Sequence, residues 1–364
     1  MLIAAILVLT CIVAVYLFMH GAPFGALPSG DRLKKISQSP NYRDGQFQNL
    51  NPTPALTEGA SFFGIFREFF FDRNKQKQPP GPLPSMKTDL LHLDPAHNIL
   101  VWFGHSSYFM QVDQKTILVD PVFSGNASPL SGTTKSFKGS DIYTVPDLPV
   151  IDYLFITHDH WDHLDYKTLL QLKPKVNKII TGLGTAAHLA SWGYDENMII
   201  EMDWNESVKP EPGFTVTALP ARHFSGRGFS RNKTLWMSFI FAGPGKKIYI
   251  GGDSGYDSHF KEIGKQFGPF DLAILEDGQY DKNWKYIHMM PEETVQAAMD
   301  LGAQKLLPVH WAKFSLSVHA WNDPIIRVQN EAALKKQKLI HPMIGESVNL
   351  DQDQVFRNWW ELIS

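Results

Sequence analysis

Thr157–His163 reads THDHWDH and directly follows the apolar run Ile151–Ile156. A continuous apolar run of this length is typical of a strand that is buried on both faces. Imidazoles and carboxylates are ligands suited to zinc and similar divalent metals, and on a tight loop alternate positions can converge on two neighbouring ions. The spacing therefore predicts a metal site at the end of a buried strand. The candidate ligands in this stretch are His158, His160, Asp162 and His163.

Composition limits the classes of function that the rest of the chain can serve. The 364 residues could form one large or two ordinary domains, and 43% hydrophobic residues is normal for a packed globular core. The formal net charge of -3 gives no global basic field, so nucleic acid is not expected as a partner. The only cysteine, Cys11, excludes disulfides within the chain and thiolate metal sites. Any metal is therefore expected on nitrogen and oxygen ligands.

Residues 1–20 form a membrane signal. The run Leu2–Met19 is uncharged, and as a helix it would be about 27 Å long, near the minimum for spanning a bilayer. Nothing basic precedes it and no small-residue cleavage site follows it, which favours an uncleaved anchor over a cleaved secretory signal. The basic residues Arg32, Lys34 and Lys35 come next, so the positive-inside tendency predicts a cytoplasmic catalytic part.

Residues 21–95 contain prolines that break regular elements throughout, so we expect an extended arm. Inside this arm, Ser61–Phe71 is short and heavily aromatic. Two interpretations are open. The rings cover a hydrophobic face of the main domain, or they dip into the lipid interface near the anchor.

Residues 96–364 alternate between strand-like and helix-like patterns, which suits two mixed sheets covered by helices. We therefore expect a single α+β catalytic domain here. The expected strands are 99–103, 108–112, 116–119, 151–156, 214–219, 235–241, 247–250, 272–275 and 305–307, and the expected helices are 166–172, 185–192 and 291–301.

The Thr157–His163 stretch resembles the H-x-H-x-D-H signature of the metallo-β-lactamase superfamily. The resemblance covers about residues 96–345 and implies a four-layer αβ/βα sandwich with metals at one sheet edge. It also implies three more ligands, each following an apolar strand-like segment: His223, Asp253 and His310.

A narrower resemblance points to the subfamily of N-acylphosphatidylethanolamine phospholipase D. It differs in two places, the charged loop Leu275–Tyr280 and the N-terminal anchor. The matching motifs are Trp102–Ser107, Pro220–Ser225, Thr234–Trp236 and Met290–Glu293.

The superfamily pattern implies a role for each ligand. One zinc would bind His158, His160 and His223, the other Asp162, His163 and His310, and Asp253 would bridge them. Such a pair of ions can supply a bridging hydroxide that attacks a phosphodiester. Two zinc ions carry four positive charges and the two carboxylates and hydroxide remove three, so an anionic substrate is expected.

Roles around the ligands are more open. His288 is a candidate proton donor, and His105 is a second candidate for the pocket; a structural histidine is the alternative for each. Asp159 either orients a ligand histidine or caps the loop. Trp161 and Trp311 either wall the pocket or belong to the core, and His319 is ambiguous.

These observations predict a membrane-anchored, binuclear zinc phosphodiesterase acting on phospholipid, of phospholipase D type. Two alternatives are a metal-dependent lactonase of a small anionic sugar phosphate, which would have a small polar pocket, and a non-catalytic membrane-tethered scaffold. A full set of seven polar ligands argues against the scaffold. The oligomeric state is not predicted.

Overall fold

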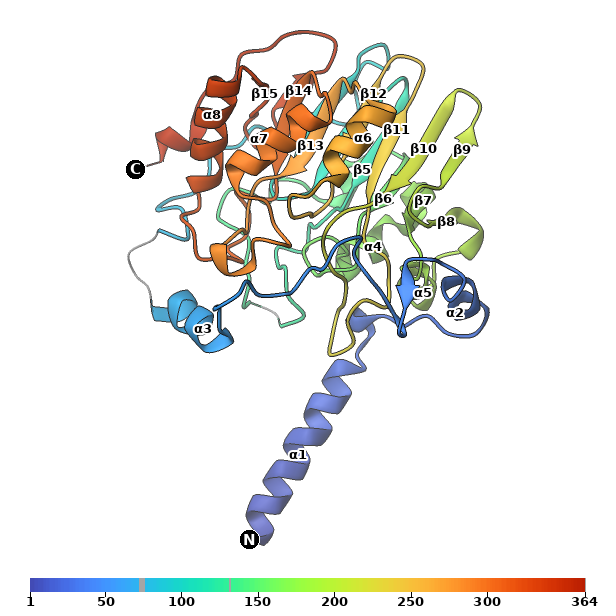
Figure 1. Cartoon of the computed structure of the whole chain (residues 1–364), viewed down its shortest axis with the longest axis vertical. Coiled ribbons are helices and arrows are strands. Elements are labelled where there is room, and N and C mark those ends of the chain that lie inside the picture. Colours follow the sequence, from blue (N-terminus) through green and yellow to red (C-terminus); the bar gives the residue numbers. More distant parts are fainter. Residues whose placement is uncertain (72–75, 131, 364) are drawn as a thin grey trace.

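Two seven-stranded mixed sheets pack face to face and form the main core (Figure 1). The computed structural model describes residues 1–71, 76–130 and 132–363. Between the sheets, Phe155 and Phe239 meet edge to face with ring centroids 5.1 Å apart. Burial of these apolar inner faces is the main force that holds the sheets together.

Each sheet has an antiparallel part and a parallel part. The first sheet has the order β16 (Ser347–Asn349), β3 (Ile99–Trp102), β4 (Tyr108–Val112), β5 (Lys115–Val119), β6 (Ile151–Ile156), β7 (Val176–Gly182) and β8 (Ile199–Met202). The second has the order β15 (Lys338–Leu339), β14 (Lys305–Val309), β13 (Leu272–Glu276), β12 (Lys247–Ile250), β11 (Ser238–Ala242), β10 (Phe214–Leu219) and β9 (Ser207–Glu211).

Helices cover the outer faces of both sheets. Leu169 of α4 (Tyr166–Leu172) and Leu189 of α5 (Ala186–Ser191) pack with Leu154 of the first sheet. Ile263, Val295 and Val328 belong to the main core and come from helices on the second sheet. These helices are α6 (His259–Phe267), α7 (Pro291–Asp300) and α8 (Asp323–Lys335). The expected four-layer α+β sandwich is therefore confirmed.

Several predicted elements have the predicted bounds, including the strand Ile151–Ile156 and the helix Tyr166–Leu172. The strand expected at 235–241 begins only at Ser238. The reason is that the Leu235 and Met237 amides donate to Leu183 O and Thr157 O in neighbouring loops instead of joining the sheet. In the two sheets and the helices that cover them, strands β7, β8, β9, β15 and β16 and helices α6 and α8 were not predicted.

The N-terminal run forms one helix, α1 (Leu2–Met19), that projects from the body with no buried residue (Figure 1). Its length and mean hydropathy of 2.9 suffice to cross a membrane. Its anchoring in a membrane remains a prediction, and the structure gives no support for a particular face.

The arm contains more regular structure than its prolines suggest. It includes α2 (Gly30–Ile36), the hairpin strands β1 (Tyr42–Arg43) and β2 (Gln46–Phe47), and α3 (Phe62–Phe71).

Short 3-10 turns occur along the whole chain. They lie at Ala22–Phe24, Val145–Asp147, Lys173–Lys175, Glu196–Met198, Lys282–Trp284 and Trp359–Leu362.

The rings of α3 do not cover a hydrophobic face of the domain at the four positions where their exposure is described. Phe62, Phe63, Phe66 and Phe71 are between 54% and 78% exposed. Because more than half of each of these side chains is exposed, the first of the two interpretations of this segment is wrong for them.

Candidate metal centre

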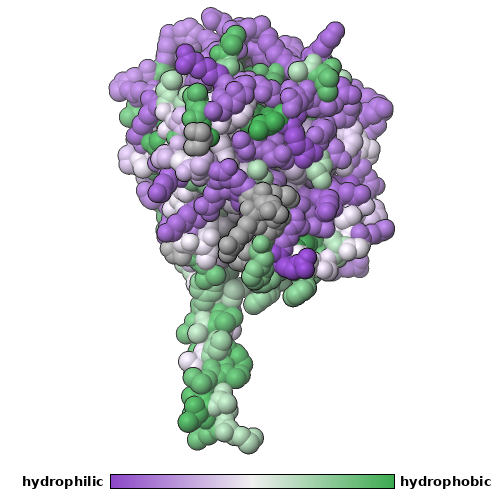
Figure 2. Space-filling view, turned by 90° about the vertical axis from the view of Figure 1, so that its left-hand side faces the viewer, coloured by the Kyte–Doolittle hydropathy of each residue, from purple (hydrophilic) through white to green (hydrophobic). Residues whose placement is uncertain are grey.

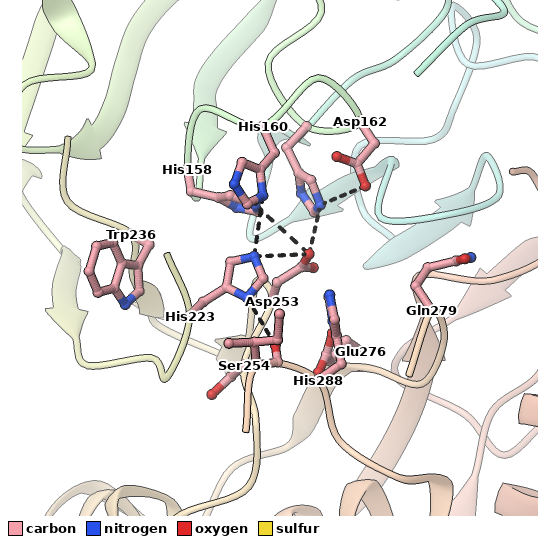
Figure 3. A network of polar contacts seen from close by, with 12 residues as sticks. His158, His160, Asp162, His223, Trp236, Asp253, Ser254, Glu276, Gln279 and His288 are labelled. Carbon is pink, nitrogen blue, oxygen red and sulfur yellow. Dashed lines mark hydrogen bonds and ion pairs between the residues drawn. The ribbon is translucent and has the colours of Figure 1, made fainter. Parts of the chain in front are cut away.

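All seven predicted ligands lie at one edge of the sandwich, where four strands end. Figure 3 shows five of them together: His158, His160, Asp162, His223 and Asp253. His158–His163 follows β6, His223 follows β10, Asp253 follows β12 and His310 follows β14. β5 to β8 are parallel, as are β12 to β15. The carboxyl ends of parallel strands share an edge, which explains how ligands far apart in the chain meet.

The first group consists of three histidines whose ring nitrogens face one another. His160 Nδ1 lies 2.9 Å from His158 Nε2 and 3.2 Å from His223 Nε2. Asp253 Oδ2 lies 3.8 Å from both Nε2 atoms. Three imidazole nitrogens this close, all within 4.8 Å of one another, can hold one metal ion.

The second group is built around His163 and Asp253. His163 Nε2 lies 3.2 Å from Asp253 Oδ2 and 3.6 Å from Asp162 Oδ2. His310 Nδ1 lies 3.2 Å from Asp253 Oδ1, the other oxygen of the same carboxylate. Asp253 therefore faces both groups, as a bridging ligand would.

The donor atoms fit divalent metals by an independent test. His163 Nε2 and Asp253 Oδ1 are buried and have no hydrogen-bond partner in the described structure. Burial lowers the pKa of His158, His223 and His310 well below the usual value, which keeps these rings neutral. Neutral imidazole is the form that binds metal, and a cation would satisfy the two orphaned atoms.

Hydrogen bonds on the far side of the rings fix their orientation. His163 Nδ1 lies 2.8 Å from Asp120 Oδ2, and His223 Nδ1 donates to Ile287 O at 2.9 Å. These contacts hold the Nε2 atoms toward the centre, as is usual around metal-binding histidines. Asp120 also accepts from the Thr157 amide and hydroxyl. Sequence reasoning missed Asp120, although it directly follows β5 as the predicted ligands follow their strands.

His105 lies behind the centre and supports it. Its ring is fully buried, and its Nε2 lies 2.8 Å from Asp162 Oδ2. Both His105 and His310 have a positive φ (53° and 71°), and the His310 amide donates to His105 O at 3.0 Å. Such strained backbone persists where its surroundings determine it strongly. His105 is placed to position Asp162, and it is not among the cavity-lining residues that the structure describes.

His288 lies at the open side of the centre and forms an ion pair with Glu276. His288 Nδ1 is 2.6 Å from Glu276 Oε2, and the Met289 amide donates to the other carboxylate oxygen. Burial raises the pKa of Glu276 to about 7, and the facing His288 opposes that rise. The carboxylate in turn raises the pKa of His288 against the effect of burial. The charged loop that distinguished the sequence thus supports a histidine of the cavity.

Asp159 and the two tryptophans have structural partners. Asp159 accepts from the Gly226 amide at 2.6 Å and lies 3.2 Å from His188 Nε2, so it braces the loop and does not touch a predicted ligand. Trp161 packs against Arg227, and Trp311 stacks in the core. His319 accepts from the Gln279 amide at 2.8 Å and is outside the metal groups.

A cavity of about 310 Å³ opens above the centre. Candidate metal ligands form its floor, and residues of the arm form part of its wall. Its lining residues are Ala55, Leu56, Phe62, Ile65, His160, Asp162, His223, Phe224, Arg231, Asp253, Gln279, Trp284, Ile287, His288, His310 and Leu316.

Residues 115–311 match a family model described as a beta-lactamase superfamily domain. An N-acyl-phosphatidylethanolamine-hydrolyzing phospholipase D of Caenorhabditis elegans is 32% identical over 312 residues, which are 78% of this chain and 82% of that protein. The chain belongs to the metallo-β-lactamase superfamily. This assignment confirms the resemblance found in the sequence, and it makes the protein a metal-dependent hydrolase by family.

Two further similar proteins extend the comparison. An uncharacterized protein of Mycobacterium tuberculosis is 37% identical over 349 residues, 94% of each chain. The structure of a metallo hydrolase from Ignicoccus hospitalis, 23% identical, aligns with a TM-score of 0.54 over 69% of this chain and 97% of that chain. At this identity the likeness shows the fold alone.

Proposed function

We propose that this protein is a binuclear zinc phosphodiesterase that cleaves N-acylphosphatidylethanolamine-type phospholipids. The observation that carries the proposal is the joining of two features in one cavity. Five of the seven candidate metal ligands, namely His160, Asp162, His223, Asp253 and His310, form its floor. Its wall includes an apolar stretch of the arm with Leu56, Phe62 and Ile65. A phosphodiester with long apolar chains has both of the matching parts. The similarity to the C. elegans phospholipase D supports this substrate class.

The ligand set defines how the phosphate would be held. His158, His160 and His223 would hold one ion, Asp162, His163 and His310 the other, and Asp253 would face both. Two zinc ions would supply the nucleophilic hydroxide and offset negative charge on the phosphoryl oxygens. His105 and Asp120 keep the carboxylate of Asp162 and the ring of His163 in place.

His288 is proposed as the proton donor. Hydrolysis breaks the bond between phosphorus and the ethanolamine oxygen, giving phosphatidic acid and an N-acylethanolamine. The departing alkoxide needs a proton. His288 lines the cavity, and its Nδ1 is engaged by Glu276, which leaves Nε2 for the leaving group.

The arrangement of the whole chain is part of the proposal. Residues 1–20 would anchor the protein in a membrane, 21–95 would form the arm that lines the cavity, and 96–364 would form the catalytic domain. The alternative lactonase calls for a small polar pocket, and the apolar wall lends that reading no support.

The decisive assay compares substrates and metals with full-length protein in detergent. We expect hydrolysis of N-acylphosphatidylethanolamine, loss of activity with a chelator, and recovery with zinc. A sugar-phosphate lactone and a soluble phosphodiester serve as comparison substrates. Turnover of the lactone alone, or none of any substrate at full metal content, would overturn the proposal.

A further inference from the structure

The chain is fastened to the body of the protein immediately after α1. The Arg227 Nε and Nη2 atoms donate to Pro23 O at 3.2 and 2.8 Å, and Trp192 Nε1 donates to Ala22 O at 2.7 Å. Gly25 has a φ of 68°, and a Cβ there would lie 2.2 Å from His188 Nδ1, so the backbone presses against that ring. α1 is therefore joined to the body without a slack linker.

Arg227 connects this attachment to the candidate metal centre. Its guanidinium is buried, and its Nη1 donates to the carbonyls of Asp159 and Leu164 at 2.8 Å each. The same group lies 3.9 Å from the ring centroid of Trp161, which also contacts Phe24 edge to face. The direction of α1 is thus set relative to the loop that carries four of the predicted ligands.

Large apolar side chains gather on the side of the body from which α1 emerges. α3 lies on this side, as does the loop 226–231, which hangs toward α1 (Figure 1). Phe63 is 78% exposed and Phe229 is 87% exposed. Figure 2 shows hydrophobic residues around the base of the body where the helix leaves it, whereas the rest of this face is mainly hydrophilic. Exposed aromatic patches of this kind mark interaction sites.

Basic side chains and the mouth of the cavity lie on this same surface. Arg67 and Lys282 line one hollow together with Phe63 and Phe71. Arg231 lines the cavity above the metal centre, and its guanidinium lies 5.1 Å from the Phe224 ring centroid. Aromatic rings flanked by basic groups suit the headgroup region of a bilayer, where rings enter the acyl boundary and cations meet phosphates.

We propose that the body lies on the same bilayer that holds α1, with α3 and the loop 226–231 inserted in its surface. The rigid attachment at Arg227 presents this surface to the membrane, so the cavity opens onto the lipid headgroups. The surface is defined by Phe62, Phe63, Phe66, Phe71 and Phe229. This inference rests on α1 being retained in a membrane, which is part of the proposed function, and it holds for any lipid substrate.

Fluorescence quenching by lipid tests the docking directly, without an activity readout. Cys11 is the only cysteine and lies in α1, so a probe on the natural chain reports the anchor. In a Cys11→Ser background, Phe63→Cys and Phe229→Cys report the docking surface. Leu334→Cys is the matched control, because Leu334 is 77% exposed and precedes β15, which pairs with the start of β14, away from the metal edge.

The full-length protein is placed in phosphatidylcholine–phosphatidylglycerol nanodiscs that contain lipid spin-labelled either near the headgroup or deep in the acyl chain. We expect the deep label to quench the probe at 11, because Cys11 lies in the middle of α1. The shallow label should lower the intensity at 63 and 229 at least about twofold and change the probe at 334 little. If the probe at 11 is quenched while those at 63 and 229 match the control, docking is overturned and the anchor stands. An unquenched probe at 11 overturns both.

Activity then separates docking from catalysis. Phe63 and Phe229 do not line the cavity among the residues that the structure covers, so Phe63→Ser with Phe229→Ser should spare the hydrolysis of a soluble short-chain phosphodiester. Turnover of vesicle lipid should fall by about tenfold, because surface attachment is lost. Equal loss on both substrates, or loss on neither, would contradict docking. A wild-type protein inactive on both substrates would refute the proposed function and leave the quenching result unaffected.

Discussion

The edge with the candidate metal centre and the side of the body beside α1 depart from the usual pattern of burial in opposite ways. At the metal edge, polar side chains such as His163 and Asp253 are almost completely buried. On the side of α1, large apolar side chains such as Phe63 and Phe229 are exposed to solvent. Buried polar groups and exposed apolar patches are the informative exceptions in a folded protein.

The difference shows what each region requires from outside the chain. Buried nitrogen and oxygen atoms without hydrogen-bond partners can be satisfied by bound cations. Exposed aromatic rings can be covered by an apolar phase. The two regions meet in one cavity, because Phe62 and His160 both line it. Experiments on either region can test this difference.

The largest effect is expected from Asp253→Asn. Among the described residues, the Asp253 carboxylate faces both histidine groups, and the amide removes the negative charge that they share. We expect kcat to fall by on the order of 10³-fold or more, with metal content reduced. His97→Ala is the matched control, because the side chain of His97 is 53% exposed and remote from the centre. Unchanged turnover and metal content in the Asp253 variant would remove the metal centre from the comparison.

Metal removal should have the next largest effect. A ligand present at about 100 to 1,000 times its dissociation constant stabilises the native state by about 3–4 kcal/mol. Dialysis against a chelator should therefore lower the free energy of unfolding by this amount, and zinc should restore it. Urea titrations before and after dialysis give the difference. If the apo and metal-loaded proteins unfold at the same urea concentration, the buried polar cluster is stable without cations.

His259 tests a buried histidine outside the metal groups. Burial lowers its pKa from 6.5 to about 4. Between these values the unfolded chain takes up a proton and the folded protein does not, so stability is full above pH 6.5 and falls as the pH decreases. The expected loss at pH 5.5 is on the order of 1 kcal/mol. It is measured in the metal-free protein as the stability of the natural chain relative to His259→Asn at pH 7.5 and 5.5. A difference that does not change with pH contradicts the assignment.

The smallest effect is expected from Phe63→Ser in the absence of lipid. Because this ring is largely exposed, its loss should change the free energy of unfolding in detergent by less than about 0.5 kcal/mol. The same substitution at Phe239, which is fully buried between the sheets, should cost several times more. Comparable losses at both positions would mean that α3 belongs to the core.

Sequence patterns predicted most of the residues at the candidate metal centre and few of the contacts in the region beside α1. The stretch Thr157–His163 predicted its loop, and the superfamily resemblance implied the three other candidate ligands, each of which follows an apolar strand-like segment. Asp120 has that signal too, but a single aspartate after a strand cannot be told from a turn residue without knowing that His163 lies beside it. Arg227 carries no local signal, since its role depends on Pro23, Asp159 and Leu164 meeting in space.

The aromatic segment shows a different limit. Arg67 and Glu68 give Phe62–Phe71 a polar side, but the periodicity does not indicate whether the apolar side packs on the protein or faces another phase. Whether such rings are buried depends on the shape of the body beside them, which no local pattern describes. The missed strands β8 and β9 lie near or at sheet edges, where burial is partial and the apolar alternation is weak.

The pairing of β16 with β3 limits how early the first sheet can be completed during synthesis. Leu100 pairs with Val348, so the first strand of the domain obtains that neighbour only when the last strand has left the ribosome. Long-range pairings of this kind form late in folding and leave a sheet edge open meanwhile. During synthesis the apolar N-terminal helix emerges far earlier. A truncation before residue 347 would therefore yield a product that still carries α1 but leaves the edge of β3 unpaired. Such a product should aggregate.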